Sequence, residues 1–226
     1  MLKALIFDVD GTLAETEEIH RRAFNELFDE WGLGWHWDIE KYGQLLKVTG
    51  GKERIAAYLD EIGDHWDFAC IKELHEAKTA RYVSLLDGIT LRPGIAELIA
   101  RAQREGLRIA IATTTSLPNV ERLIEAAFDD NPFEVIAAGD QVARKKPASD
   151  VYDLALARLG LPADQCLALE DSLNGVNSAL GAGLPVVVCK ARYTLDEDLS
   201  AATCEIDSYE TMARAEDLTA FARQTA

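Results

Sequence analysis

The chain has 226 residues and carries 23 lysines and arginines against 39 aspartates and glutamates, which gives a formal net charge of −16. Hydrophobic residues make up 48% of the chain and charged residues 27%, a globular composition that excludes wholesale disorder. So large a negative charge argues against a nucleic acid or an anionic membrane as a partner. An anionic substrate would therefore need cations placed locally to overcome the charge of the whole molecule.

The cysteines and the N-terminal residues indicate a cytoplasmic protein. The apolar stretch over residues 3–7 is too short for the core of a signal peptide, and no run approaches the length of a membrane span. The four cysteines show no C-x-x-C pair and no histidine at metal-ligand spacing, which is typical of free thiols in a reducing compartment. They are Cys70, Cys166, Cys189 and Cys204.

The first predicted element is a buried strand over residues 3–7, and a long helical segment follows it. Four amphipathic stretches make up this segment, over residues 16–31, 39–47, 52–62 and 68–86. Because no strand pattern interrupts them, we expect residues 15–85 to form a helical cap domain inserted into a core. The core would then comprise residues 1–14 and 86–226, with linkers near residues 14–15 and 87–88.

Strands and helices alternate after the insertion. Further apolar runs that end in polar loops lie at residues 107–112, 134–138, 166–169, 185–189 and 204–206. Helical patterns cover residues 94–105, 117–127, 148–159 and 173–182. This alternation predicts an α/β fold with a parallel sheet covered on both faces. In such folds ligands bind beyond the carboxyl ends of the strands, which is where the polar loops fall.

Four acidic residues follow two of the predicted strands. Asp8 and Asp10 lie two positions apart after the first strand, with Gly11 next to them where a tight turn would need it. Carboxylates this close repel one another unless a cation lies between them, and Glu170 and Asp171 would add two more at the same edge. Oxygen ligands without histidine or cysteine suit Mg²⁺, so we expect these four acids to hold a magnesium ion.

The same loops offer the groups that phosphoryl transfer requires. We expect Asp8 to attack phosphorus and form an aspartyl phosphate, and Asp10 to protonate the leaving alcohol and later deprotonate water. Lys146 would bring positive charge to the transferring group, and Thr113 would bring a hydroxyl. Backbone amides of three residues would cradle the remaining oxygens: Gly11, Thr12 and Thr114.

Each of these clusters taken alone has an ordinary structural interpretation. Asp-Val-Asp-Gly can form an Asx turn, residues 113–116 can cap a helix, and residues 144–146 can be a solvated charge run. Glu170 and Asp171 can start a helix, where acids favour the helix dipole. Four clusters in this order, each after a strand or in the loop beyond one, favour one shared catalytic site.

In these residues the chain resembles the haloacid dehalogenase-like phosphatases, whose four motifs match one by one. They match at residues 8–12, at Thr113, at residues 146–147, and at residues 169–172 with residues 174–175. The resemblance implies a Rossmann-like core with an inserted helical cap of the C1 type, an aspartate nucleophile and Mg²⁺. The dehalogenases themselves carry tyrosine in place of the second acid of the first motif, so phosphoryl transfer is favoured over carbon–halogen cleavage.

Within this superfamily, residues 8–20 resemble the β-phosphoglucomutase-like branch. Residues 14–18, 49–55 and 113–116 resemble the CbbY-type sugar-bisphosphate phosphatases more closely. This resemblance implies removal of one phosphate from a sugar bisphosphate, foremost xylulose-1,5-bisphosphate. The cap match is shorter than the core match, so it is a weaker guide to the substrate than the core motifs are to the chemistry.

The run Thr-Gly-Gly-Lys-Glu-Arg at residues 49–54 lies between two predicted helices. Its glycines permit close backbone approach, and Lys52 and Arg54 add charge, so we expect it to grip the phosphate that is not transferred. Alternatively it is a helix C-cap followed by a surface helix. Lys78 and Arg81 would complete a basic lid, or lie solvated on a helix face. The expected substrate contacts are Glu17, Thr49, Gly51, Lys52, Arg54, Lys78, Arg81, Thr114, Thr115 and Asn119.

Other cap side chains leave two interpretations open. His20 could position Asp10 or simply bond to a neighbour on its helix face. Tyr42 could bind substrate or pack in the interior. The tryptophans at positions 31, 35 and 37 surround a glycine-containing turn, which favours packing over binding.

These observations predict a monomeric, Mg²⁺-dependent phosphatase with a small-molecule sugar phosphate as its substrate. A phosphomutase, which would return the phosphoryl group to a sugar hydroxyl, stays open, as does a phosphatase of another small metabolite such as phosphoglycolate. A non-catalytic sensor of sugar phosphates is disfavoured, because Asp8, Asp10 and Lys146 are all present.

Overall fold

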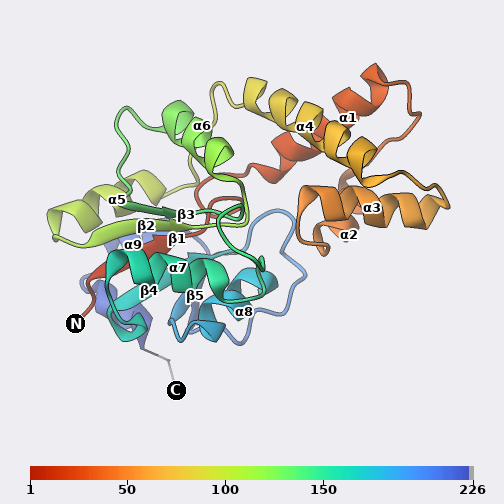
Figure 1. The fold of residues 1–226 in the computed structure, drawn as a ribbon. Helices are drawn as coiled ribbons and strands as arrows, with labels where there is room; N and C mark the ends of the chain where they lie inside the picture. Colours follow the sequence, from red (N-terminus) through yellow and green to blue (C-terminus); the bar gives the residue numbers. More distant parts are fainter. Residues whose placement is uncertain (224–226) are drawn as a thin grey trace. The chain divides into compact units, whose positions relative to one another are not determined.

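The computed structural model describes residues 1–223 and divides the chain into two compact units (Figure 1). One unit comprises Met1–Glu15 with the described residues from Ile89 onward, and the other comprises Thr16–Gly88. The core range expected from the sequence ends at residue 226, and its last three residues lie outside the described part of the chain. The chain therefore leaves the first unit soon after its first strand and returns to it once.

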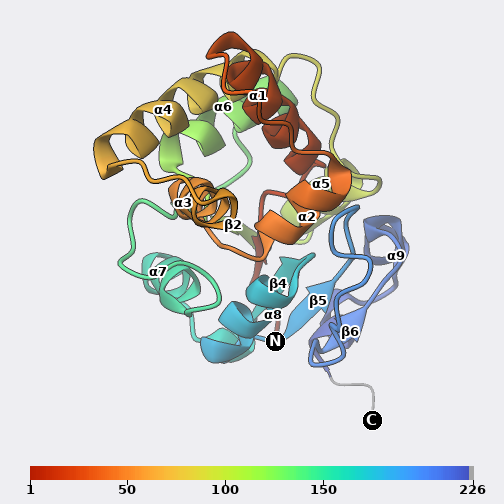
Figure 2. The same ribbon diagram turned by 90° about the vertical axis from the view of Figure 1, so that its right-hand side faces the viewer.

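Within residues 1–223, the first unit is built on a six-stranded sheet in the order β3-β2-β1-β4-β5-β6, with every neighbouring pair parallel. Figure 2 shows β4, β5 and β6 side by side. The predicted α/β fold class is confirmed, and each strand falls at one of the predicted apolar runs. The strands are β1 (Ala4–Phe7), β2 (Arg108–Ala112), β3 (Val135–Ala137), β4 (Cys166–Glu170), β5 (Val186–Val188) and β6 (Cys204–Glu205).

Helices cover both faces of this sheet, which explains why β1 is apolar at every position and fully buried. Alternate residues of a strand point to opposite faces. On one face, Ala4 and Ile6 pack in a single core with residues of α7 (Asp150–Leu159) and α8 (Leu173–Gly181). Burial on both faces fixes the strand register, and with it the level at which each strand ends.

The remaining helices of this unit are α5 (Ile95–Arg104), α6 (Leu117–Ala127) and α9 (Tyr209–Arg214), with short 3₁₀ turns at Ala163–Gln165 and Leu218–Ala222. α5 packs against β2 and against α9. The sequence analysis predicted α5 and α6 but not α9 or the 3₁₀ turns. Segments of six residues or fewer are too short to display a helical period.

The second unit consists of α1 (Glu17–Glu30), α2 (Ile39–Leu46), α3 (Gly51–Ile62) and α4 (Phe68–Ser84). α1 packs against α4, and α3 contacts both α2 and α4. Trp37 is fully buried against Phe24 and Phe28, and the side-chain amide of Asn25 bonds to both backbone groups of Trp37. This tryptophan therefore packs in the interior, whereas Trp31 is 36% exposed. None of the helices in residues 1–223 is both long and apolar enough to cross a membrane.

Candidate active site

Strand order brings the predicted polar clusters together at the carboxyl edge of the sheet. β1 lies between β2 and β4, and Phe7 is aligned with Ile111 of β2 and Leu169 of β4. Asp8, which follows β1, is thereby flanked by the ends of both neighbouring strands. The chain order of the strands reverses between β1 and β4, and ligands of open α/β sheets bind at such a switch point.

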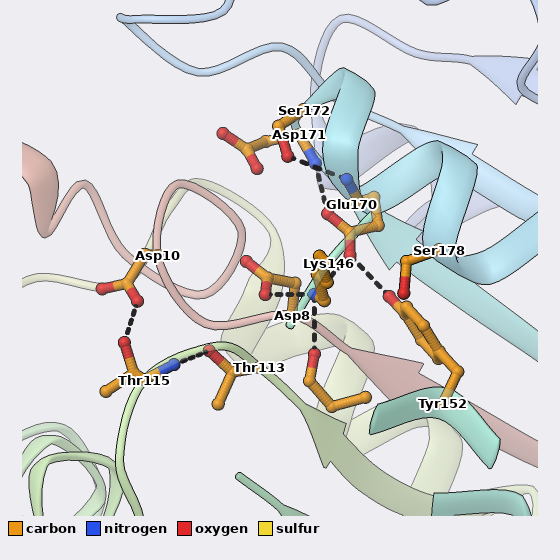
Figure 3. A network of polar contacts seen from close by, with 12 residues as sticks. Asp8, Asp10, Thr113, Thr115, Lys146, Tyr152, Glu170, Asp171, Ser172 and Ser178 are labelled. Atoms are coloured by element: carbon orange, nitrogen blue, oxygen red, sulfur yellow. Dashed lines mark hydrogen bonds and ion pairs between the residues drawn. The ribbon is translucent and has the colours of Figure 1, made fainter. Parts of the chain in front are cut away.

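Lys146 lies between two of the acids (Figure 3). Its ammonium group donates hydrogen bonds to Oδ1 of Asp8 at 2.6 Å, to Oε1 of Glu170 at 2.6 Å and to the carbonyl oxygen of Ala112 at 2.8 Å. These bonds use all three ammonium protons. Lys146 is 4% exposed and Glu170 is fully buried, so the ion pairs are shielded from water. A buried ion pair of this kind is tolerated only when its partners are hydrogen-bonded.

Burial dominates the protonation of this cluster. The pKa of Asp8 is raised from 3.8 to about 8, because burial, the largest cause, and the carboxylates of Glu170 and Asp10 together outweigh the opposing effect of Lys146. Burial alone would lower the pKa of Lys146, but Asp8 and Glu170 outweigh it, so the pKa lies above its ordinary value. Lys146 is therefore a permanent cation at neutral pH, whereas Asp8 needs further positive charge to stay ionised.

Three carboxylates form a possible metal site. Asp8, Glu170 and Asp171 each offer an oxygen, these atoms lie within 4.8 Å of one another, and all three residues are buried. One lysine cannot balance three carboxylates, and a set made only of oxygens suits a hard divalent cation. The chemistry of the donors therefore fits Mg²⁺. Oδ2 of Asp10, which was also expected to be a ligand, accepts a hydrogen bond from the hydroxyl of Thr115 (Figure 3).

The loop after β2 brings two threonines to the site. The backbone amide of Thr115 donates to Oγ1 of Thr113 at 3.1 Å, and the amide of Thr113 donates to the carbonyl of Ala137. Thr113 is fully buried, and the bond from the Thr115 amide fixes the position of its hydroxyl oxygen. Asn119, in the first turn of α6, is 9% exposed, and Thr114 is half-buried.

Two glycines allow the acids to approach the backbone. A Cβ atom on Gly11, whose φ is +81°, would lie 2.2 Å from Oδ2 of Asp171. A Cβ atom on Gly175, in α8, would lie 1.8 Å from Oε2 of Glu170. No larger side chain fits either position without moving an acid of the site.

The sequence analysis missed two tyrosines that hold Glu170. The hydroxyl of Tyr152 donates to Oε1 of Glu170 at 2.6 Å, and that of Tyr209 donates to its backbone carbonyl at 3.3 Å. Both tyrosines are fully buried. Tyr152 lies on the apolar face of α7, so the helical period marks it as a core residue. The signal that could have found it is chemical, because a buried phenol needs a hydrogen-bond partner.

Within the second unit, Glu17, Tyr42 and Arg54 form one network. The Tyr42 hydroxyl donates to Oε2 of Glu17 at 2.6 Å, and Nη1 of Arg54 donates to the Tyr42 hydroxyl at 3.1 Å. Nε of Arg54 donates to the carbonyl of Leu45, and the guanidinium lies over the Tyr42 ring. The structure thus brings two expected substrate contacts, Glu17 and Arg54, together through a tyrosine.

The glycine-rich run at residues 49–54, in which α3 begins, is tightly packed. A Cβ atom on Gly51 would lie 2.4 Å from Nε2 of His75, so the histidine ring occupies the space that a side chain would need. Thr49 and Lys52 are half-buried, and the Lys52 ammonium lies 5.6 Å from the centre of the Phe68 ring.

The two cations expected in a basic lid have partners within the second unit. Nζ of Lys78 lies 2.8 Å from Nδ1 of His20 and 4.7 Å from the centre of the Phe24 ring, and Lys78 is only 4% exposed. Arg81 donates to Glu26 at 2.9 Å and to Glu30 at 2.6 Å. Two glutamates of α1 therefore balance the charge of Arg81 on α4.

Comparison with known proteins agrees with this geometry. The model of the haloacid dehalogenase-like hydrolase family matches residues 2–183. Protein CbbY of Rhodobacter capsulatus is 56% identical over 210 residues, which cover 91% of this chain and 92% of that protein. A crystal structure of a CbbY mutant from Rhodobacter sphaeroides, in complex with xylulose-1,5-bisphosphate, has a TM-score of 0.87 at 52% identity and covers 93% of this chain and 96% of its own.

A more distant structure shares the fold. β-Phosphoglucomutase from Clostridium difficile has a TM-score of 0.80 at 23% identity, and the match covers 94% of this chain and 93% of that one. The family match covers most of the chain and includes the strand-end residues described above. The chain therefore belongs to the haloacid dehalogenase-like hydrolases and is a phosphoric monoester hydrolase similar to CbbY.

Proposed function

We propose that this protein is a Mg²⁺-dependent phosphatase that removes one phosphate from a sugar bisphosphate, with xylulose-1,5-bisphosphate as the first candidate. The observation that carries the proposal is the buried arrangement in which Lys146 bonds to both Asp8 and Glu170, with Asp171 beside them. The substrate is suggested by the similar CbbY structure, which is a complex with that bisphosphate.

In the proposed reaction, an oxygen of Asp8 attacks phosphorus, and the bond between phosphorus and the sugar oxygen breaks. Asp10 gives a proton to the departing sugar oxygen. A water molecule then attacks the aspartyl phosphate, Asp10 takes back a proton, and Asp8 is released with inorganic phosphate. The two steps together consume one water and leave both aspartates as they began.

The other groups supply charge and position. Lys146 holds Oδ1 of Asp8, which favours the ionised nucleophile and fixes its direction. Asp8, Glu170 and Asp171 would hold Mg²⁺, whose charge would neutralise part of the negative charge on the phosphoryl oxygens. Thr113 and the nearby backbone amides would donate hydrogen bonds to the same oxygens.

We assign substrate selection to the unit Thr16–Gly88, acting as a cap. Lys52 and Arg54 would bind the phosphate that is not transferred, and Glu17 would accept a hydrogen bond from a sugar hydroxyl. Arg81 is left out of this assignment, because Glu26 and Glu30 balance its charge. Lys78, which is buried against His20 and the Phe24 ring, stays a candidate contact, as does Arg54, which is also buried.

Phosphate release from a panel of sugar phosphates, with Mg²⁺ and with a chelator, tests the proposal. The panel should include xylulose-1,5-bisphosphate, other sugar bisphosphates, β-glucose 1-phosphate and phosphoglycolate. We expect Mg²⁺-dependent release from a bisphosphate, lost in Asp8→Asn and kept in the control Asp130→Asn, which alters an exposed residue outside the site. Phosphate release from none of these substrates, or release unaffected by the chelator or by Asp8→Asn, would contradict the proposal. Isomerisation without free phosphate would identify a mutase instead.

A further inference from the structure

Arg92 lies where the chain has just returned to the first unit. Its backbone amide donates to the carbonyl of Leu13 at 2.8 Å, and the preceding Leu91 forms an antiparallel bridge with Ala14. These contacts place Arg92 beside the turn that follows β1 and carries Asp8 and Asp10. No motif in the sequence marks it.

The guanidinium of Arg92 bonds to two loops at the carboxyl edge of the sheet. Nη1 donates to the carbonyl oxygens of Gly11 and, at 2.8 Å, of Cys189. Nη2 donates to the carbonyl of Lys190 at 2.7 Å and contacts Sγ of Cys189 at 3.3 Å. The side chain is 10% exposed. One planar group therefore joins the turn after β1 to the loop after β5.

Both loops contact or carry the proposed catalytic acids. Gly11 follows Asp10, and its amide donates to Ala14 to close the turn. Cys189, on the other loop, donates its amide to the carbonyl of Glu170 at 2.9 Å. The guanidinium also lies 5.5 Å from the centre of the Tyr209 ring, whose hydroxyl bonds to that same carbonyl.

We infer that Arg92 is a positioning residue that fixes the turn bearing Asp10 against the strand end bearing Glu170. The inference rests on the proposed function only for the activity assay that tests it. A guanidinium presents five donors in a fixed plane and reaches the acceptors of Gly11, Cys189 and Lys190 together, whereas the three donors of an ammonium start from one atom and cannot reproduce this planar spread. Displacement of a catalytic group by about 1 Å can cost about 100-fold in rate.

The ion pair between Arg92 and Glu15 is a minor part of this arrangement. Nε of Arg92 lies 3.4 Å from Glu15, whose side chain is 46% exposed, and exposed pairs contribute little. Glu15→Gln should therefore leave activity unchanged. This variant separates the carbonyl contacts of Arg92 from its charge pairing.

Arg101 provides a matched control. Its side chain is 9% exposed and donates to the backbone carbonyls of Met212 and Glu216. Like Arg92, it also forms one ion pair, with Glu105. It lies on α5 and touches neither loop of the site. Arg92→Lys and Arg101→Lys should lower stability to a similar extent, and only Arg92→Lys should impair catalysis.

The test compares kcat, KM and amide hydrogen exchange in both variants. For Arg92→Lys we expect kcat to fall about 10- to 100-fold with KM within about threefold, and exchange to rise in residues 9–14. In Arg92→Ala, methylguanidinium should restore part of kcat and methylammonium should not. Equal kcat in the two lysine variants, or an unchanged exchange in residues 9–14, overturns the inference. If the native enzyme releases no phosphate from any sugar phosphate, the proposed function fails, and hydrogen exchange in residues 9–14 still decides the role of Arg92.

Discussion

The hydroxyl of Tyr152 donates a 2.6 Å hydrogen bond to Oε1 of Glu170, the same oxygen that accepts a bond from Lys146. Burial, followed by the carboxylates of Glu170 and Asp8, raises the pKa of Tyr152 well above its ordinary value. The phenol therefore stays protonated and remains a donor at neutral pH. Oε1 of Glu170 therefore accepts one hydrogen bond from a cation and one from a neutral hydroxyl.

Tyr152→Phe should lower both stability and turnover, because it removes this donor and leaves the ring in place. A hydrogen bond to a charged group contributes about 1.5–3 kcal/mol, and we expect the free energy of unfolding to fall by that amount and kcat by about tenfold. Tyr209→Phe is the matched control, since the Tyr209 hydroxyl is equally buried but bonds to the Glu170 backbone at 3.3 Å. Urea unfolding and steady-state kinetics measure both. Equal effects in the two variants would contradict a specific role for the Glu170 side chain.

Lys146→Met should abolish activity and destabilise the fold. It removes the cation between Asp8 and Glu170 and leaves buried carboxylates without it, a change that typically costs about 3–5 kcal/mol. We expect kcat to fall by about 10³-fold or more, because the nucleophile loses both its charge partner and its direction. The neighbouring Lys145 is only half-buried and serves as the control. Lys145→Met should keep most of the activity, and a comparable loss there would show that the two lysines act through general charge.

The sheet could be predicted from the sequence because its central strands are buried on both faces. β1 and β4 lie in continuous apolar runs, and each run is followed directly by an acid, Asp8 after β1 and Glu170 as the last residue of β4. The positions of Asp8, Thr113 and Glu170 at one edge then follow from parallel pairing alone. Local pattern and global fold agree in this region, which is why simple rules succeed there.

The partners of these residues could not be predicted, because they depend on tertiary packing. The helical period records the ring of Tyr152 but not the direction of its hydroxyl. Arg92 bonds to backbone carbonyls 81 and 98 residues away, and a backbone acceptor leaves no mark in a sequence. Similarly, the bond from Thr115 to Asp10 depends on how the loop after β2 turns, which its hydroxyl-rich sequence does not specify.

Gly175→Ala should impair catalysis far more than helix propensity would suggest. Alanine favours a helix interior by roughly 0.5–1 kcal/mol over glycine, but the new Cβ would lie 1.8 Å from Oε2 of Glu170. Glu170 must then move, and we expect kcat to fall by about 10- to 100-fold. Gly181, in the same helix, is the control, because its Cβ would meet only Cβ of Ser149 at 3.5 Å. Gly181→Ala should leave kcat unchanged, and equal kinetics for the two variants would show that the Glu170 position is not critical.

Stability without metal should depend on pH through Asp8. Its pKa rises from 3.8 in the unfolded chain to about 8 in the folded protein, mainly through burial. Between these values the folded state binds more protons than the unfolded state, so the free energy of unfolding falls as pH rises. A carboxylate must be ionised to bind Mg²⁺, so stabilisation by the metal should grow over the same range.

We therefore expect metal-free protein to lose stability as pH rises from about 4 to about 8, and millimolar Mg²⁺ to restore more of it at the higher pH. Asp8→Asn should remove both effects, and subtracting its pH dependence cancels the contributions of all groups other than Asp8. Asp217→Asn is the control, because a hydrogen bond from Thr219 lowers the pKa of Asp217. The stability that ionised Asp217 contributes is therefore lost only in more acidic solution. Thermal unfolding at several pH values, with and without Mg²⁺, measures these differences. If native protein and Asp8→Asn show the same pH dependence and the same response to Mg²⁺, Asp8 is not the group that links protons to the metal.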